Sequence, residues 1–245
     1  MEFISVFEML KIGVGPSSSH TLGPWRAAEQ FLAELNEKQI LKKVTRVEID
    51  LFGSLSLTGK GHATDMAIVL GLSGENPETI IVEKITGIIE RVKSEGKLSL
   101  SNQHSIAFAF EKDIVFNKNF LPFHANALTF KAFYDNTSYQ STFYSIGGGF
   151  VVKEGIATAN KKQEIKFPYP VEKADELLQH CTSTGKKISE IVFENEKMLR
   201  SETEINNELM RIWETMLECM YIGCHTEGIL PGGLNVKRGA FDIYQ

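Results

Sequence analysis

The sequence predicts an α+β domain that is followed by a linker and by the beginning of an all-helical domain. Helical and strand-like segments alternate first, a period-two pattern then runs over residues 98–153, and only helical periodicity follows. We therefore expect the α+β domain over residues 1–155, the linker over 156–185, and a truncated start of an α domain over 186–245.

The first predicted elements are an amphipathic helix and a half-buried strand. Apolar side chains from Trp25 to Leu35 recur on one helical face, and Pro24 suits the first turn because its missing N–H is not needed there. Over residues 46–52 apolar and charged side chains alternate, which is typical of a strand with one buried face.

A second helix is expected after Asn76. Asn76 and Pro77 are typical of a helix cap and of the first helical position. Apolar residues from Ile81 to Val92 follow at helical spacing, and Gly96 would end the helix.

The segment 98–153 predicts an antiparallel run of strands. Apolar side chains alternate with smaller ones around Phe108 and Phe130, and Asp135-Asn136 predicts a turn. The run Gly147-Gly148-Gly149 indicates a bulge or a closely packed backbone, and it lacks the spacing of a dinucleotide-binding loop.

The remaining chain is predicted to be helical. After a polar stretch that ends in Phe167-Pro168-Tyr169-Pro170, helical spacing occurs over residues 174–181, 188–199 and 204–224. The residues beyond have no predicted partner to pack on. We therefore expect these helices to begin a larger helical domain that is missing from the chain.

Composition argues against several partners. The net charge is −5 and basic residues are scattered, so no nucleic acid is expected as a partner. No apolar run reaches the roughly 18–20 residues that span a bilayer, and the first residues lack a signal-peptide pattern. We therefore expect no membrane association and a cytoplasmic location. Three cysteines, an odd number without a disulfide pattern, fit a reducing compartment.

The first candidate site is a hydroxyl-rich loop directly before the first helix. It reads Gly15-Pro16-Ser17-Ser18-Ser19-His20-Thr21. Backbone N–H groups and the positive end of the helix dipole attract an anion there, and these side chains add donors for a carboxylate or a phosphate. The alternative is that Ser19 or Thr21 merely caps the helix, and the residues alone leave both interpretations open.

The second candidate site is the loop over residues 58–65, after the strand. Its two glycines allow close backbone approach, and Thr64 or Asp65 could cap the next helix. The spacing is not that of a Walker loop. Histidine titrates near neutrality, so His62 would suit a general base, although a lone loop histidine is more often a surface or structural residue.

The third candidate site contains His124 and Asn126, which lie just ahead of a predicted strand. Residues two apart in extended chain point the same way, so both side chains could face one pocket. The alternative is a turn that closes a hairpin, with Asn126 bonded to its own backbone.

The cysteines do not predict a metal site. Cys219 and Cys224 are five residues apart on a predicted helix, which places them about 140° apart around its axis. C-x-x-C is absent, and Cys224 with His225 is only a weak zinc signal. We assign no metal ligand within the chain.

Together these motifs resemble those of one enzyme family. The serine loop with Gly23-Pro24, the run 59–65, His124 with Asn126, the glycine run, and Thr226-Glu227-Gly228-Ile229-Leu230-Pro231-Gly232-Gly233-Leu234 occur in the order seen in iron–sulfur L-serine dehydratases (L-serine ammonia-lyases). The chain resembles the N-terminal part of the single-chain bacterial type, which is a β domain with the start of an α domain.

The resemblance implies that L-serine is deaminated to pyruvate and ammonia by removal of the α-proton and iron-assisted loss of the β-hydroxyl. It implies that His62 and His124 are the acid/base pair and that Asn126 and the serine loop (Ser17, Ser18, Ser19, His20 and Thr21) bind the substrate. The 4Fe–4S cluster of the complete enzyme would be held by cysteines beyond Gln245, so the isolated chain is expected to be inactive. A homodimer is consistent with the family.

One departure from the family affects His124. The family usually has His-Pro-Asn-Gly-Met where this chain has His124-Ala125-Asn126-Ala127-Leu128, so the Pro and Gly that shape the turn are absent. This puts the placement of His124 in question, and we favour His62 as the base.

A hypothesis from another class stands beside the enzyme. The first domain resembles a ligand-binding module that is also attached to a serine-pathway dehydrogenase. Residues 1–155 would then bind an amino acid or a related anion as a non-catalytic regulatory module. Tight binding of L-serine by this chain alone would favour the module, and failure to bind would favour a split active site.

Overall fold

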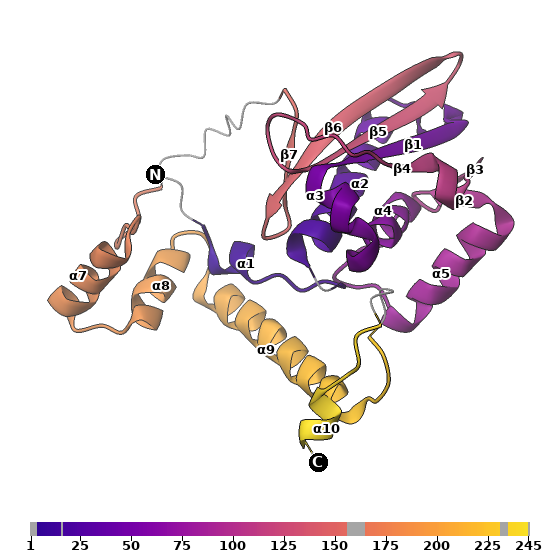
Figure 1. Ribbon diagram of the computed structural model, residues 1–245. Helices are drawn as coiled ribbons and strands as arrows, with labels where there is room; N and C mark the ends of the chain where they lie inside the picture. The colour runs from indigo at the N-terminus through magenta and orange to yellow at the C-terminus, as the bar shows by residue number, and fades with distance from the viewer. Residues whose placement is uncertain (1–3, 16, 156–164, 231–234, 245) are drawn as a thin grey trace. The chain divides into compact units, whose positions relative to one another are not determined.

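The computed structural model describes residues 4–15, 17–155, 165–230 and 235–244. The chain forms two compact units. The helical unit comprises Met1–Lys11, Ala159–Glu227 and Gly239–Gln245, and the α/β unit comprises Ile12–Thr158 and Gly228–Arg238. The predicted class, a mixed α and β fold with helices in the C-terminal part, is confirmed (Figure 1).

A five-stranded sheet lies at the centre of the α/β unit. Its strands are β1 (Arg46–Phe52), β4 (Ile114–Phe116), β5 (Asn126–Tyr134), β6 (Thr137–Gly147) and β7 (Phe150–Lys153). Their order is β4-β1-β5-β6-β7. β1 pairs in parallel with β4, and the other neighbours pair antiparallel. β2 (Lys97–Leu100) and β3 (His104–Ala107) form a separate two-stranded sheet.

The predicted antiparallel run is therefore correct for the pair β2–β3 and for β5 to β7, and wrong for residues 110–116 between them. Phe110, which continues the apparent alternation, begins the short helix α6 (Phe110–Asp113). The Asp113 carboxylate accepts a hydrogen bond from the Ala109 amide at 2.7 Å and closes this turn. The chain then runs along β1 as the parallel strand β4.

The core of the α/β unit lies between the sheet and its helices. α2 (Gly23–Glu37) contacts α4 (Thr64–Ser73) and also β5, β6 and β7. Trp25, Phe31 and Leu35 on the predicted apolar face are fully buried. The two helices approach closely at Gly71, where a Cβ would lie 2.7 Å from the Trp25 carbonyl oxygen.

The second predicted helix starts later than expected. α5 spans Val82–Glu95, and Ile81 is its N-cap. Asn76 does not cap it, because its side-chain oxygen accepts from the Glu78 amide at 2.8 Å within a separate turn. The predicted end is confirmed, since Gly96 follows α5 in the left-handed region with φ of 62°.

One predicted turn and one predicted bulge of the sheet are confirmed. Asp135 and Asn136 have φ of 43° and 60° between β5 and β6, which is the backbone of a tight hairpin turn. The register between β6 and β7 shifts between Ser145 and Gly147, so a bulge lies at the predicted glycine run.

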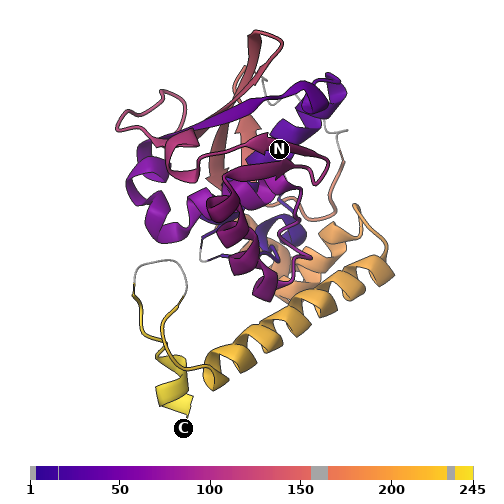
Figure 2. The ribbon, with the colours of Figure 1, turned by 90° about the vertical axis from the view of Figure 1, so that its right-hand side faces the viewer.

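The helical unit contains α7 (Ala174–Thr184), α8 (Ile188–Glu196), α9 (Glu202–His225) and the short α10 (Ala240–Tyr244). α7 occupies part of the predicted linker 156–185, whose residues 156–164 lie outside the described ones. The expectation that the last residues have no partner is wrong, because α10 packs against the end of α9 (Figure 2). The rings of His225 and Tyr244 meet there at 5.2 Å.

The N-terminal segment Met1–Lys11 groups with the helical unit, whereas the domain predicted over residues 1–155 includes it. Ser5 caps the short helix α1 (Val6–Met9). The buried Glu196 carboxylate accepts from the Ser5 hydroxyl at 3.0 Å and from the Val6 amide at 2.7 Å, and Arg200 donates to it at 2.9 Å. These bonds explain why residues far apart in sequence form one compact unit.

Candidate active site

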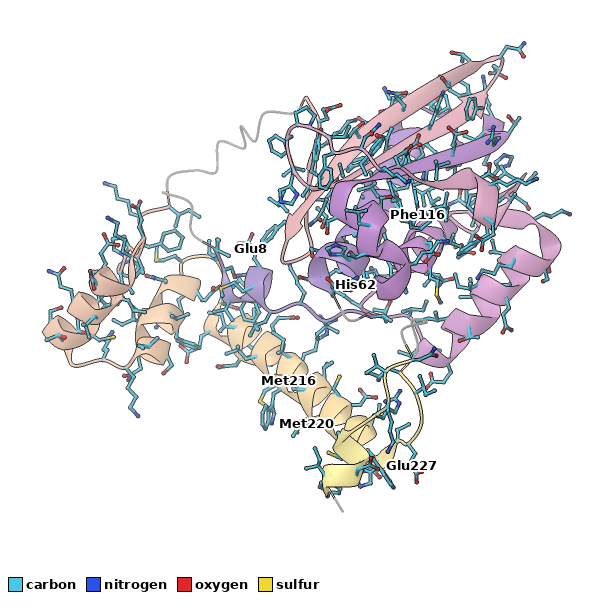
Figure 3. The ribbon with its side chains drawn as sticks, in the orientation of Figure 1. Glu8, His62, Phe116, Met216, Met220 and Glu227 are labelled. Carbon is cyan, nitrogen blue, oxygen red and sulfur yellow. The ribbon has the colours of Figure 1, made fainter. Side chains whose placement is uncertain are left out.

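His62 lies at the end of η3 (Gly59–His62), between α3 (Gly53–Thr58) and α4 (Figure 3). Its ring is half-buried, and its Nδ1 is 2.9 Å from the Thr58 carbonyl oxygen. A carbonyl oxygen only accepts, so Nδ1 carries the hydrogen and Nε2 of the neutral ring keeps its lone pair. This is the tautomer that a general base requires at Nε2.

The backbone turns sharply directly after His62. Ala63 has φ of 54° and ψ of 35°, in the left-handed region that costs a residue with a Cβ about 1–2 kcal/mol. Ala63 is also the N-cap residue of α4, so the predicted caps Thr64 and Asp65 are wrong. A strained backbone of this kind persists only where the surroundings over-determine it.

Two threonine hydroxyls hold this turn against the serine loop. Thr21 donates to the His62 carbonyl oxygen at 3.0 Å, and the fully buried Thr64 donates to the His20 carbonyl oxygen. The two loops, forty residues apart in sequence, are therefore joined in both directions.

The serine loop forms the short π-helical turn η1 (Ser18–Leu22), which continues into α2. Ser17 is its N-cap, and its hydroxyl accepts from the His20 amide at 3.2 Å. The Ser19 hydroxyl is 2.9 Å from His20 Nδ1 and 3.4 Å from the Ser17 hydroxyl. Pro16 of this motif lies outside the described residues.

His20 is the residue at which these bonds converge. Its Nε2 is 2.9 Å from the Ser54 hydroxyl, and its ring centroid is 4.8 Å from that of His62. Burial lowers the pKa of His20 below its ordinary value of 6.5, the nearby His62 charge lowers this pKa further, and a hydrogen bond with Ser54 opposes both. His20 is thereby favoured in its neutral form beside His62.

Replacing His62 with Gln should raise the pKa of His20 towards 6.5 without reaching it, because the charge is removed and the burial remains. A side-chain NMR titration of the 245-residue chain measures this shift. His104→Gln is the matched control, since the His104 ring is bonded to the Val44 carbonyl oxygen and is no cause of the His20 shift. An unchanged His20 pKa in His62→Gln would contradict the coupling of the two rings.

The same shift fixes how His20 contributes to stability. Its folded-state pKa is lower than the unfolded value of 6.5, so the unfolded chain binds more protons between the two values. The contribution of His20 to the free energy of unfolding is therefore present above pH 6.5 and is lost as the pH falls through this window.

His124 and Asn126 form a turn that enters β5. The Asn126 amide donates to His124 Nδ1 at 3.1 Å, and the Asn126 side chain donates to the Ser145 carbonyl oxygen at 3.2 Å. Because His124 Nδ1 accepts, its neutral ring carries the hydrogen on Nε2. His124 therefore presents a donor at the nitrogen where His62 presents an acceptor.

A contact between Gly23 and Ser145 packs the start of α2 onto β6. A Cβ placed on Gly23 would lie 1.9 Å from the Ser145 hydroxyl oxygen. Within the described part of the chain, this hydroxyl is buried without a hydrogen-bond partner. The end of the serine loop therefore packs directly on β6. The Ser145 carbonyl oxygen of the same strand accepts the hydrogen bond from the Asn126 side chain.

The profile of the family described as "Serine dehydratase beta chain" matches residues 5–156, more than half of the chain. The chain belongs to this family. An L-serine dehydratase of Haemophilus influenzae is 41% identical to the chain over 245 residues, which cover 99% of the chain and 54% of the relative.

Further relatives show similar identity and similar coverage of the chain. L-serine dehydratase 1 of Escherichia coli is 44% identical over 239 residues, which cover 97% of this chain and 53% of the relative. The L-serine dehydratase of Streptomyces coelicolor is 44% identical over 243 residues, which again cover 97% and 53%. The chain spans about half the length of these curated relatives.

Of the predicted site residues, the structure gathers Ser17, Ser19, His20, Thr21 and His62 into one hydrogen-bonded cluster. The hydroxyls of this cluster bind protein groups and shape the turn. Ser18 is exposed. The turn that holds His124 and Asn126 connects to the cluster through Ser54, whose amide donates to the Ala125 carbonyl oxygen at 2.8 Å.

Sequence reasoning missed Ser54. The only available signal was its position, directly after the predicted strand and after Gly53 at the start of a new element. Gly53 has φ of 56°, and a Cβ there would lie 2.2 Å from the Ala125 carbonyl oxygen. Only glycine fits this close approach without strain, so the strand-to-helix turn brings Ser54 to the His124 turn.

The described residues of the chain do not fit an iron–sulfur cluster. Among them no group of three or more His, Cys, Asp or Glu side chains is placed to hold a metal ion. Cys181 lies on α7, whereas Cys219 and Cys224 lie on different faces of α9.

In the described ranges, no helix is both long and apolar enough to cross a membrane.

Proposed function

We propose that this chain supplies the proton-transfer groups and the carboxylate anchor for the conversion of L-serine to pyruvate and ammonia. The observation that carries the proposal is the opposite tautomer of two histidines. His62 Nδ1 donates to a carbonyl oxygen, whereas His124 Nδ1 accepts from an amide. One neutral ring then offers a base and the other an acid at Nε2. The names of the curated relatives support L-serine as the substrate.

His62 is the general base in this proposal. The α-proton of L-serine passes to His62 Nε2, and the electron pair of the C–H bond stays on the α-carbon. The Nδ1–H bond to the Thr58 carbonyl oxygen is kept throughout and stabilises the imidazolium that forms. Neutral His20 beside the ring avoids placing a second positive charge at this position.

His124 is the candidate acid. The electron pair on the α-carbon forms the C=C bond as the β C–O bond breaks with its own pair on oxygen, and the leaving hydroxide takes the His124 Nε2 proton to become water. Return of the proton held by His62 to His124 through solvent restores both neutral rings. The product 2-aminoacrylate tautomerises to an imine, which water hydrolyses to pyruvate and ammonia. One water is lost and one is regained, so the atoms of L-serine balance.

The serine loop is the proposed carboxylate anchor. By helix geometry the amides of Ser18 and Ser19 have no acceptor within η1, and they lie at the positive end of the continuous η1–α2 helix. The exposed Ser18 hydroxyl adds a donor, and the Asn126 side chain is the proposed second polar contact. The alternative of a purely regulatory module does not account for the paired tautomers.

The 4Fe–4S cluster implied by the sequence resemblance is proposed to be held outside these residues. The cysteines of the chain do not converge, and the cluster has no part in the proton transfers assigned to His62 and His124. The whole enzyme is accordingly proposed to need residues beyond those that match the chain.

A protein in which these residues continue to the full length of the relatives should release pyruvate and ammonia in equal amounts from L-serine. A coupled lactate dehydrogenase assay under anaerobic conditions measures pyruvate, and D-serine is the control substrate because its α-proton would point away from the base. Binding of L-serine without release of pyruvate would favour the regulatory module instead.

A further inference from the structure

Ser54 occupies the first turn of α3 and contacts both candidate histidine loops. Its hydroxyl is 2.9 Å from His20 Nε2. Its amide donates to the Ala125 carbonyl oxygen at 2.8 Å, in the turn between His124 and Asn126. The preceding Gly53 amide donates to the Asn119 carbonyl oxygen at 2.8 Å, so the backbone of this corner is fixed from two sides.

The Ser54 hydroxyl completes a chain of hydrogen bonds through the His20 ring. Ser19 lies at Nδ1 and Ser54 at Nε2, both at 2.9 Å. A neutral imidazole has one donor and one acceptor nitrogen, and each hydroxyl can serve either. One hydroxyl therefore satisfies each ring nitrogen, and two bonds at opposite sides restrain the rotation of the ring.

The orientation of His20 matters because its ring packs beside His62. The centroids are 4.8 Å apart and the planes are inclined by 36°. A freely rotating His20 ring would no longer hold the His62 ring on that side. A single hydrogen bond, at Nδ1, restrains the rigid His62 ring, and the packing against His20 is a second restraint on the direction of its Nε2.

We propose that Ser54 is a positioning residue that fixes the His20 ring through its hydroxyl and thereby orients His62 Nε2 for proton abstraction. This inference rests on the proposed function for its kinetic consequence, whereas the fixed His20 ring is a property of the chain alone. Displacement of a reacting group by about 1 Å can cost about a hundredfold in rate. Removal of the hydroxyl should therefore lower kcat by about 10–100-fold and change KM little.

The chain offers a matched set of variants on one helix. Ser54→Ala removes the hydroxyl, Ser54→Thr keeps it, and Ser56→Ala removes a hydroxyl from the same helix α3 away from His20. The first readout is the imidazole ¹⁵N shift of His20 in the 245-residue chain, which needs no turnover. The second is kcat and KM of the full-length enzyme with L-serine. Circular dichroism and Tm verify that each variant is folded.

We expect Ser54→Ala to shift the His20 Nε2 resonance and to lower kcat, Ser54→Thr to restore both, and Ser56→Ala to leave both unchanged. A folded Ser54→Ala chain with parental His20 resonances would overturn the fixed ring. A shifted resonance with parental kcat would overturn the positioning role while leaving the proposed function intact. Failure of the parent enzyme to form pyruvate would refute the proposed function and with it the kinetic role, whereas the resonance result would still decide the fixed ring.

Discussion

Replacing His62 with Gln in the full-length enzyme should lower kcat for L-serine by about 10²–10⁴-fold, the usual contribution of a positioned general base. Glutamine is similar in size and can still donate an N–H to the Thr58 carbonyl oxygen, but it cannot take up a proton. Steady-state kinetics with anaerobically prepared enzyme measures the loss. His104→Gln is the control, because His104 bonds to the Val44 carbonyl oxygen and lies outside the cluster.

A check of folding separates loss of the base from a general disturbance of the site. His62→Gln should lower kcat while its circular dichroism spectrum still shows a folded chain. Parental turnover in a folded His62→Gln enzyme would remove His62 from the mechanism and return the role of base to His124.

The second large effect is expected at Gly23, in stability. An alanine there would place its Cβ 1.9 Å from the Ser145 hydroxyl oxygen and 2.7 Å from its Cβ, both buried. Gly23→Ala should lower the free energy of unfolding by about 1–3 kcal/mol or more, the range for an overpacked core. Equilibrium urea unfolding of the 245-residue chain measures this loss.

Two further variants test this steric explanation. Gly87→Ala adds the same Cβ inside α5, where nothing lies within 4 Å, and should stabilise by about 0.5–1 kcal/mol. Ser145→Gly combined with Gly23→Ala should recover part of the loss, because the clashing atoms are gone. Equal changes in the free energy of unfolding for Gly23→Ala and Gly87→Ala would mean that the close contact at Gly23 does not affect stability.

The elements with dense periodic patterns could be predicted from the sequence. The helix around Phe31 and the strand over residues 46–52 bury the faces that their apolar spacing indicated. Asn76 shows the limit of local signals. A side-chain oxygen that accepts from an amide two residues ahead is common to helix caps and to isolated turns, and here the turn occurs. The sequence pattern alone does not distinguish them.

The candidate site was predictable as motifs but not as an arrangement. The serine loop and His62 each attracted attention by composition, yet nothing in the pattern indicated that His20 and His62 lie ring to ring. The tautomers depend on the Thr58 carbonyl oxygen and the Asn126 amide, which are backbone groups without a sequence signature. Ser54 was missed for the same reason, because its contacts with His20 and with the Ala125 carbonyl oxygen arise only in the folded chain.

The bond between Ser5 and Glu196 has a consequence for the order in which the protein is made. The two residues are 191 positions apart, so at about 5–20 residues per second the ribosome needs roughly 10–40 s to synthesise the second after the first. During that time the N-terminal segment cannot form its bond with Glu196, while the α/β unit is synthesised and can fold. We therefore expect the α/β unit to fold first during synthesis. The N-terminal segment would pack against Glu196 only after that residue has been made.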